Sequence, residues 1–182
     1  MLQSLLNLDG AFLLWIQDCL RTPLLDAFFS FYTKLGDAGL FWIVLSLLLL
    51  FFRPTRKAGL VSLTAMLLGL LCTNVVLKHL VGRTRPWLVV EGLTHLVEEN
   101  DPNSFPSGHT CAAFASAIAW LGTLPKRWMK VTALVLAVLM GFSRLYVGVH
   151  FPSDVLAGAL VGTACGWLAL QLWRRLDPQE RL

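Results

Sequence analysis

Charged residues are few in this sequence for a protein of its length. Only 14% of its 182 residues are charged and 56% are hydrophobic, whereas soluble domains contain about 25% charged residues. This shortage excludes an ordinary soluble domain and indicates a chain that lies in a lipid bilayer. The net charge of +4 is small, and the basic residues form short runs between apolar segments. We therefore expect no nucleic-acid partner, because nucleic-acid binding requires basic residues clustered on one surface.

Patterns that bind metals or cofactors are also missing. The four cysteines show neither a CxxC pair nor another metal-ligand spacing, and no cluster of Asp, Glu and His residues suggests a metal site. We expect no cofactor. The sequence contains no internal repeat and no low-complexity tract. A cleavable signal peptide is not expected, because the N-terminus lacks a basic region and Asp9 and Asp18 interrupt its apolar residues.

Long apolar segments are present instead. A helix needs about 20 mainly apolar residues to cross the hydrocarbon core of a bilayer. Five segments reach or approach this length, at 38–52, 57–80, 108–124, 128–148 and 153–173. Membrane-spanning backbone must form helices or a closed barrel, and such long continuous apolar runs exclude the barrel. The predicted fold class is therefore all-α, a polytopic membrane helix bundle of about five transmembrane helices.

Residues 1–36 differ from these segments because charged side chains stand among their large apolar ones. We expect two short amphipathic helices here, near 9–20 and 23–34, that lie along the membrane surface. A sixth crossing is the alternative, but it would bury several charges. The predicted organisation is an interfacial N-terminal part at 1–36, a transmembrane catalytic domain at 37–174 and a cytoplasmic tail at 175–182.

The basic residues orient the predicted helices. They concentrate in the linkers 53–57 and 126–130 and in the C-terminal tail. Cytoplasmic loops carry an excess of Lys and Arg, and five crossings place all three clusters on one side of the membrane. That side is predicted to be cytoplasmic. The 81–106 loop and the 149–152 turn then face the extracytoplasmic side.

Three short stretches at the predicted extracytoplasmic ends carry reactive side chains. They are Lys78-x6-Arg85-Pro86, Pro106-Ser107-Gly108-His109 and Ser143-Arg144-x5-His150-x3-Asp154. Arginine presents a planar fork that suits phosphate oxygens, and lysine presents a point charge. Lys78, Arg85 and Arg144 are therefore candidate ligands of a phosphoryl group. Each alone could be an interfacial anchor, but their occurrence together on one side favours a phosphate site.

The second stretch precedes an apolar helix. Ser107 is the expected N-cap, and Gly108 allows the backbone to approach a ligand closely. Free N–H groups at the start of a helix favour an anion, so a phosphate is expected to bind there. Taken alone, the stretch would also suit an ordinary capped helix with an incidental histidine at His109.

His150 and Asp154 suit nucleophilic catalysis. A neutral imidazole nitrogen can attack phosphorus, and a carboxylate that holds the hydrogen on the other nitrogen orients the ring as in hydrolytic triads. The alternative is an aspartate helix cap beside an interfacial histidine. His79 and His95 lack partners at a suitable spacing, so no role is expected for them. Because arginine and lysine can stabilise developing charge, we expect catalysis without a metal.

Together the three stretches resemble the signature of the type 2 phosphatidic acid phosphatase (PAP2) superfamily, K-x6-RP, PSGH and SR-x5-H-x3-D. All three match in order and without substitution. The resemblance implies nucleophilic attack by His150 to form a phosphohistidine, orientation of His150 by Asp154, and acid–base catalysis by His109. It implies phosphate binding by five residues, namely Lys78, Arg85, Ser107, Gly108 and Arg144.

The small size and apolar composition are similar to those of bacterial integral-membrane members of this family. The resemblance therefore implies a lipid phosphatase in the bacterial cytoplasmic (inner) membrane, and the basic linkers predict that its active site faces the extracytoplasmic side. Undecaprenyl diphosphate is the preferred substrate, because this carrier must be dephosphorylated outside the cell. Phosphatidylglycerophosphate and phosphatidic acid are the alternatives.

Phosphate transfer, transport and haloperoxidase activity are the three other functions to compare with hydrolysis. Transfer of the phosphate to a second lipid is compatible with the same motifs. A non-enzymatic transporter would leave the coincidence of His109, His150 and Asp154 unexplained, and the haloperoxidases of the family are soluble. The expected partners are the bilayer and the lipid phosphate, and the motifs carry no information on oligomeric state.

Overall fold

The computed structural model describes residues 2–176, with side chains from residue 8 onward. Within this range the regular structure is helical, and no strand occurs. In chain order the elements are α1 (Leu2–Leu20), α2 (Pro23–Leu35), the 3-10 turn η1 (Asp37–Gly39), α3 (Leu40–Leu50), α4 (Arg56–Leu70), the π-helical segment η2 (Leu71–Leu77), α5 (Lys78–Val81), α6 (Pro86–Val89), α7 (Gly108–Thr123), α8 (Arg127–Tyr146) and α9 (Pro152–Leu176). The prediction of an all-α fold is confirmed.

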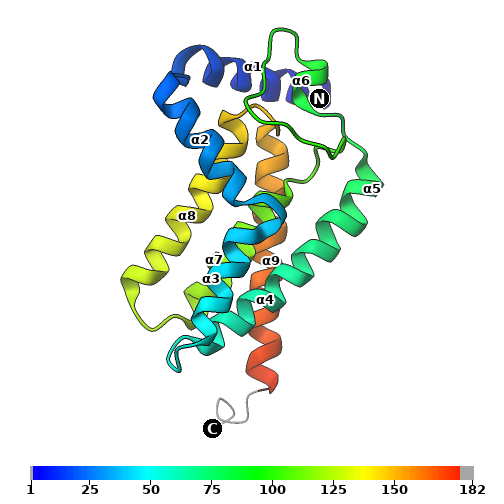
Figure 1. The fold of residues 1–182 in the computed structure, drawn as a ribbon. Coiled ribbons are helices and arrows are strands. Elements are labelled where there is room, and N and C mark those ends of the chain that lie inside the picture. Colours follow the sequence, from blue (N-terminus) through cyan, green and yellow to red (C-terminus); the bar gives the residue numbers. More distant parts are fainter. Residues whose placement is uncertain (1, 177–182) are drawn as a thin grey trace.

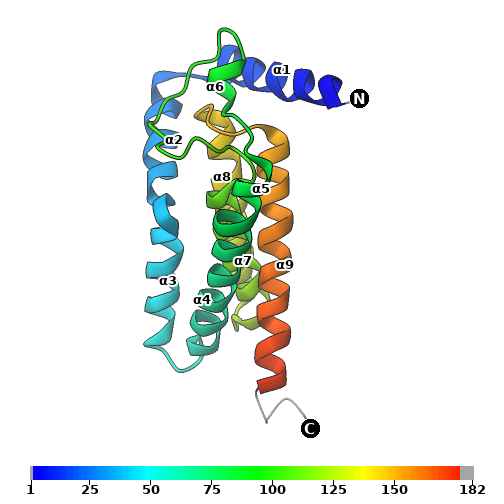
Figure 2. The same cartoon turned by 90° about the vertical axis from the view of Figure 1, so that its right-hand side faces the viewer.

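The long helices form a bundle with α7 in the middle (Figures 1 and 2). α7 packs against α4, α8 and α9. The turns 51–55 and 124–126 and the end of α9 lie at one end of the bundle, which we call the basic end. The segments 82–107 and 147–151 lie at the opposite end, which we call the loop end.

Within residues 2–176, three spans are long and apolar enough to cross a membrane. They are α8, α9 and the continuous span Arg56–Val81, which joins α4, η2 and α5. α2 and α3 would form a fourth span as a pair bent by 52°. α7 has only 16 residues, although it runs between the two ends of the bundle (Figure 2). All five predicted segments are thus helical, but length and composition alone support three or four crossings.

The N-terminal region departs from the expected pair of surface helices. α1 lies across the loop end of the bundle, as a surface helix would (Figure 2). α2 instead packs along α8 and leads through η1 into α3. The reason is aromatic packing, since the buried ring of Phe29 lies 4.4 Å from that of Tyr146 and 5.4 Å from that of Phe142. The predicted boundary between residues 36 and 37 falls at this bend, and residues 177–182 of the predicted tail lie outside the described residues.

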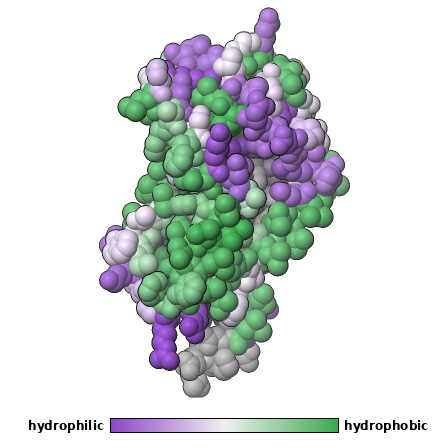
Figure 3. Space-filling model, in the orientation of Figure 1, coloured by the Kyte–Doolittle hydropathy of each residue, from purple (hydrophilic) through white to green (hydrophobic). Residues whose placement is uncertain are grey.

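The outer face of the bundle is apolar over much of its length (Figure 3). Large apolar side chains stay exposed on α3, α4, α8 and α9, including Leu47, Leu67, Val135, Leu160 and Trp167. In water, an apolar surface of this extent would favour association with other apolar surfaces. Hydrophilic side chains gather at the loop end in the same view. The distribution is that of a multi-pass membrane protein.

Glycines on α9 allow it to approach α7 closely. A Cβ atom at Gly158 would lie 2.5 Å from the carbonyl oxygen of Ser107, and one at Gly162 would lie 2.3 Å from that of Cys111. Gly166 continues the same line, four residues further on. Small residues at this spacing let two membrane helices pack backbone against backbone. The close contact fixes the position of α7, and of the motif at its start, relative to α9.

The span Arg56–Val81 is not a uniform α-helix. Its residues Leu71–Leu77 are π-helical, a wider coil that occurs frequently at functional sites. Within this segment Thr73 donates a hydrogen bond of 2.9 Å to the side chain of Asn74. Both residues line the cavity described below, and Lys78 follows directly after the segment.

Candidate active site

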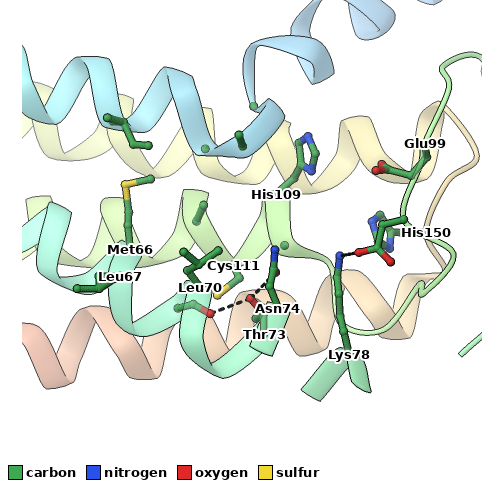
Figure 4. A pocket seen from close by; sticks show the side chains of 18 of the residues that line it. Met66, Leu67, Leu70, Thr73, Asn74, Lys78, Glu99, His109, Cys111 and His150 are labelled. Atoms are coloured by element: carbon green, nitrogen blue, oxygen red, sulfur yellow. Dashed lines mark hydrogen bonds and ion pairs between the residues drawn. The ribbon is translucent and has the colours of Figure 1, made fainter. Parts of the chain in front are cut away.

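The three predicted stretches meet at the loop end, around a cavity of about 620 Å³. One end of this cavity is polar and is lined by Lys78, Arg85, Gly108, His109 and His150. The other end lies between α3, α4 and α7, and is lined by Ile43, Leu63, Met66, Leu67 and Leu70. Figure 4 shows the labelled polar residues at one side and Met66 and Leu67 at the other. A cavity with these two ends suits an amphiphile with a charged head group and a hydrocarbon chain.

His150 lies in the turn between α8 and α9 and is 1% exposed. Its Nε2 atom is 3.0 Å from Nη1 of Arg85, and its Nδ1 atom is 3.7 Å from Oδ2 of Asp154. Burial, and after it the positive charges of Arg144 and Arg85, hold the pKa of His150 well below its ordinary value of 6.5. The imidazole is therefore neutral at pH 7, which is the form that can act as a nucleophile.

The carboxylate of Asp154 is fully buried and held on both oxygens. Oδ2 accepts a hydrogen bond of 2.9 Å from the backbone N–H of Phe151 and another from the hydroxyl of Ser104. Oδ1 accepts one of 2.7 Å from Arg83, whose guanidinium also donates to Asp9 of α1 at 3.0 Å. The surface helix α1 is thereby connected to the carboxylate next to His150.

Two of the predicted cations line the cavity directly. Arg85 is 1% exposed and donates hydrogen bonds to the backbone carbonyls of Asp101, at 2.9 Å, and Val149, at 3.0 Å. Lys78 forms an ion pair with the carboxylate of Asp101. Burial acts to raise the pKa of Asp101, but the hydrogen bond from Lys78 contributes to a pKa below its ordinary value. Asp101 is therefore ionised and partly neutralises the cavity.

Arg144, the third predicted cation, is separated from the cavity by a carboxylate. One of its amino groups donates to the hydroxyl of Thr33 at 2.6 Å, and the other is paired with Oε2 of Glu99. Oε1 of Glu99 lies 3.7 Å from Nη2 of Arg85. Glu99 thus spans two guanidinium groups, the arrangement that also suits two oxygens of a phosphate. A phosphate bound to both arginines would have to displace this carboxylate.

The start of α7 has the predicted cap. The hydroxyl oxygen of Ser107 accepts from the backbone N–H of Thr110 at 3.4 Å and from its hydroxyl at 2.9 Å. Ser107 is fully buried and does not line the cavity, whereas Gly108 does. The backbone N–H of Ser107 donates to the carbonyl of Asp154 at 3.1 Å. This bond joins the second stretch to the third.

His109 has a partner that the motifs do not contain. Its Nε2 atom lies 2.9 Å from Oδ1 of Asp37, in the turn η1 between α2 and α3. The remaining histidines are elsewhere, as expected. His79 is exposed and His95 packs on Trp87 with ring centres 4.7 Å apart, and neither lines the cavity.

Sequence reasoning missed several residues of the site, namely Asp9, Asp37, Arg83, Glu99, Asp101 and Ser104. Arg83 stands among the variable positions of the first motif, where no spacing rule singles it out. Glu99 and Asp101 belong to the acidic loop between the first two motifs, and a loop that returns acidic residues beside a cation cluster is a signal that could have revealed them. Asp37 carries no such signal, because it is distant in sequence from every motif.

A family model described as "PAP2 superfamily" matches residues 58–177. The chain belongs to the PAP2 superfamily. This PAP2 chain is also 36% identical over 149 residues to "Undecaprenyl-diphosphatase" of Sulfolobus acidocaldarius, a match that covers 81% of the chain and 70% of that relative.

Two solved structures of PAP2 proteins have the same fold. The crystal structure of Aquifex aeolicus LpxE superposes with a TM-score of 0.77 at 33% identity, covering 88% of this chain and 93% of the other. The PAP2 type phosphatidylglycerolphosphate phosphatase of Bacillus subtilis superposes with a TM-score of 0.76 at 32% identity, covering 94% and 87%. The protein is therefore a PAP2 phosphatase that acts as a hydrolase in a membrane, and the resemblance drawn from its three motifs is confirmed.

Proposed function

We propose that this PAP2 phosphatase hydrolyses undecaprenyl diphosphate through a phosphohistidine formed on His150. The observation that carries the proposal is the two-ended cavity. Neutral His150 and the cations Lys78 and Arg85 stand at its polar end, and its apolar end forms a passage between α3, α4 and α7. A polyprenyl chain would occupy the passage and its diphosphate would reach the cations. The similarity to the undecaprenyl-diphosphatase of Sulfolobus acidocaldarius supports the choice of lipid.

In the first step, Nε2 of His150 attacks the terminal phosphorus and the bond to the bridging oxygen breaks. Asp154, whose Oδ2 lies 3.7 Å from Nδ1 of His150 in the free protein, comes within hydrogen-bond distance during the reaction, holds the hydrogen on Nδ1 and stabilises the positive charge that develops on the ring. His109 gives a proton to the leaving oxygen. In the second step, His109 takes a proton from a water molecule, the resulting hydroxide attacks phosphorus, and inorganic phosphate leaves with His150 restored.

Charge stabilisation in both steps is assigned to side chains. Lys78, Arg85 and Arg144 bear the positive charge, and the N–H groups at the start of α7 add donors beside Gly108. Phosphate binding by Ser107 is included on the strength of the motif, although its hydroxyl caps α7. Among residues 8–176 no group of three or more His, Cys, Asp and Glu side chains could hold a metal ion.

The location follows from the charges at the two ends of the bundle. The basic residues of the linkers 53–57 and 126–130 lie at the basic end, opposite the cavity. By the positive-inside rule, we assign this end to the cytoplasm and the cavity to the extracytoplasmic face of a bacterial inner membrane. An undecaprenyl diphosphate released there would have direct access to His150 from within the membrane plane.

A phospholipid phosphatase is the second candidate. The similarity in fold to the phosphatidylglycerolphosphate phosphatase of Bacillus subtilis favours it, and phosphatidic acid has the same phosphate monoester. The polar end of the cavity would accept either head group, because both present the phosphate oxygens that Lys78 and Arg85 are suited to bind. Transfer of phosphate to a second lipid, in place of water, would use the same first step.

The deciding experiment measures phosphate release by the purified protein in detergent. Undecaprenyl diphosphate, phosphatidylglycerophosphate and phosphatidic acid are compared at equal surface concentration, with EDTA present. We expect the highest kcat/KM for undecaprenyl diphosphate, and a loss of at least about 10³-fold in His150→Ala, as for other nucleophile deletions. His79→Ala, at an exposed histidine outside the cavity, is the matched control and should retain full activity.

Other outcomes point elsewhere. A preference for phosphatidylglycerophosphate would favour the second candidate. Phosphorylated lipid without free phosphate would indicate transfer, and complete inactivation by EDTA would contradict metal-free catalysis. Substantial turnover by His150→Ala would disprove the phosphohistidine.

A further inference from the structure

Asp37 and His109 form a contact between two parts of the chain that the three motifs do not connect. Oδ1 of Asp37 lies 2.9 Å from Nε2 of His109. The side chain of Asp37 is 65% exposed, whereas that of His109 is 14% exposed. The carboxylate therefore covers the histidine from the side of the α2–α3 bend. It also lies outside residues 58–177, the range that the family model matches.

The backbone at the bend is shaped to allow this contact. A Cβ atom at Gly36 would lie 2.8 Å from Cδ2 of His109, so only glycine leaves room for the imidazole ring there. Ala38 and Gly39 have φ angles of 51° and 72°. This left-handed conformation is unfavourable for a residue with a side chain, and Ala38 adopts it directly after Asp37. The bend thus brings the backbone of Gly36 against the ring of His109. At the next residue it brings the carboxylate of Asp37 to Nε2 of His109.

The contact decides which nitrogen of His109 exchanges protons. A carboxylate that accepts a hydrogen bond from Nε2 keeps a hydrogen on that nitrogen. Nδ1 then remains as the nitrogen that can give a proton to a leaving oxygen and take one from water. Burial, and after it the positive charge of Arg144, lower the pKa of His109 to about 4, and the hydrogen bond and negative charge of Asp37 act against this shift.

We propose that Asp37 is a positioning residue for acid–base catalysis, which holds His109 through Nε2 and leaves Nδ1 to protonate the leaving group. This inference rests on the proposed function of His109 as the general acid. It extends the site beyond the three motifs, to the bend between α2 and α3.

The test compares two substrates whose leaving groups need different amounts of help from an acid. An alkyl phosphate has a poor leaving group that must be protonated, whereas p-nitrophenyl phosphate releases a stable anion. In Asp37→Asn we expect kcat/KM for the alkyl phosphate, which covers the steps up to departure of the leaving group, to fall about 10- to 100-fold, within the range that removal of an orienting partner produces. The kcat/KM for p-nitrophenyl phosphate should fall less than about threefold, because kcat/KM does not include the later hydrolysis of the phosphohistidine, in which His109 acts on both substrates alike.

Three variants complete the design. Asp18→Asn removes an exposed carboxylate from α1 and should leave both substrates unaffected. Asp37→Glu keeps the charge and should restore part of the alkyl phosphate activity. In a His109→Ala background, Asp37→Asn should cause no further loss, because residues that act through one another are not additive.

Equal losses on both substrates, or no loss on either, would overturn the positioning role. An additional loss in the His109→Ala background would do the same. Full activity of His109→Ala on the alkyl phosphate would overturn the proposed role of His109 and this inference with it. If His109→Ala is inactive on the alkyl phosphate while Asp37→Asn is normal, only the inference fails.

Discussion

The two histidines of the site have carboxylate partners of opposite kinds. His150 and Asp154 belong to one motif, lie four residues apart and are both buried. His109 and Asp37 come from segments 72 residues apart, and Asp37 is largely exposed. The difference matches the two tasks we propose. A nucleophile must stay neutral and fixed in a dry environment, whereas an acid–base group must exchange protons with water in each cycle.

Substitution of Asp154 is the strongest test of the difference between the His150–Asp154 pair and the His109–Asp37 pair. On p-nitrophenyl phosphate, which needs little leaving-group protonation, Asp154→Asn should reduce kcat/KM by about 10³-fold or more, the size of effect seen when the orienting aspartate of a triad is replaced. Asp37→Asn should barely change the same rate. A steady-state assay of both variants checks this. Similar losses in the two would mean that the pairs do not differ in function.

Removal of a supporting residue behind Asp154 should have a smaller effect. Arg83→Gln takes away the 2.7 Å hydrogen bond to Oδ1 of Asp154. We expect kcat to fall about 10- to 100-fold, as for other residues that orient a catalytic group, with KM little changed. Asp9→Asn keeps the bond between Arg83 and Asp154 and should cost less. An Arg83 variant with normal kcat would show that Ser104 and the backbone suffice.

The buried pair should also make stability depend on pH. The pKa of His150 is lowered in the folded protein, so the unfolded chain binds a proton there first as the pH falls. His150 then contributes fully to stability above about pH 6.5, and its contribution decreases below that by up to about 1.4 kcal/mol per pH unit.

Thermal unfolding in detergent at pH 7, 6 and 5 measures this effect. His150→Gln is the reference, because it lacks the titrating group but keeps its size. The difference in Tm between the wild type and His150→Gln should shrink, or reverse, as the pH falls. A constant difference would show that His150 titrates alike in the folded and unfolded protein.

The contrast between the local His150–Asp154 pair and the His109–Asp37 pair, which is distant in sequence, explains which parts of the site could be predicted from the sequence. The first pair is local, so the spacing of His150 and Asp154 displays it directly, and the charged residues Lys78, Arg85 and Arg144 are conspicuous in an apolar chain. The Asp37–His109 pair and the Glu99 bridge depend on how a bend and a loop fold back, which no spacing encodes. Capping of α7 by Ser107 was predicted correctly, because caps are local too.

The fold shows the same division. Apolar run length sufficed to locate each of the five long helical segments. The orientation of α2 was wrong, because amphipathicity alone does not distinguish a membrane surface from the aromatic face of α8 that Phe29 contacts. The close approach of α9 to α7 depends on which face its glycines share, and run length carries no information about faces.

The π-helical segment Leu71–Leu77 determines how far α5 is rotated about the helix axis relative to α4. The α4 part presents Leu67 and Leu70 along the passage, and Lys78 after the segment faces Asp101. Successive residues of an α-helix are about 100° apart around the axis. Deletion of a single residue from the π-helical segment, such as Val75, would therefore rotate Lys78 out of the cavity. All residues of the three motifs would still be present. In this chain the register of a membrane helix, and not only its composition, determines whether the first cation reaches the phosphate.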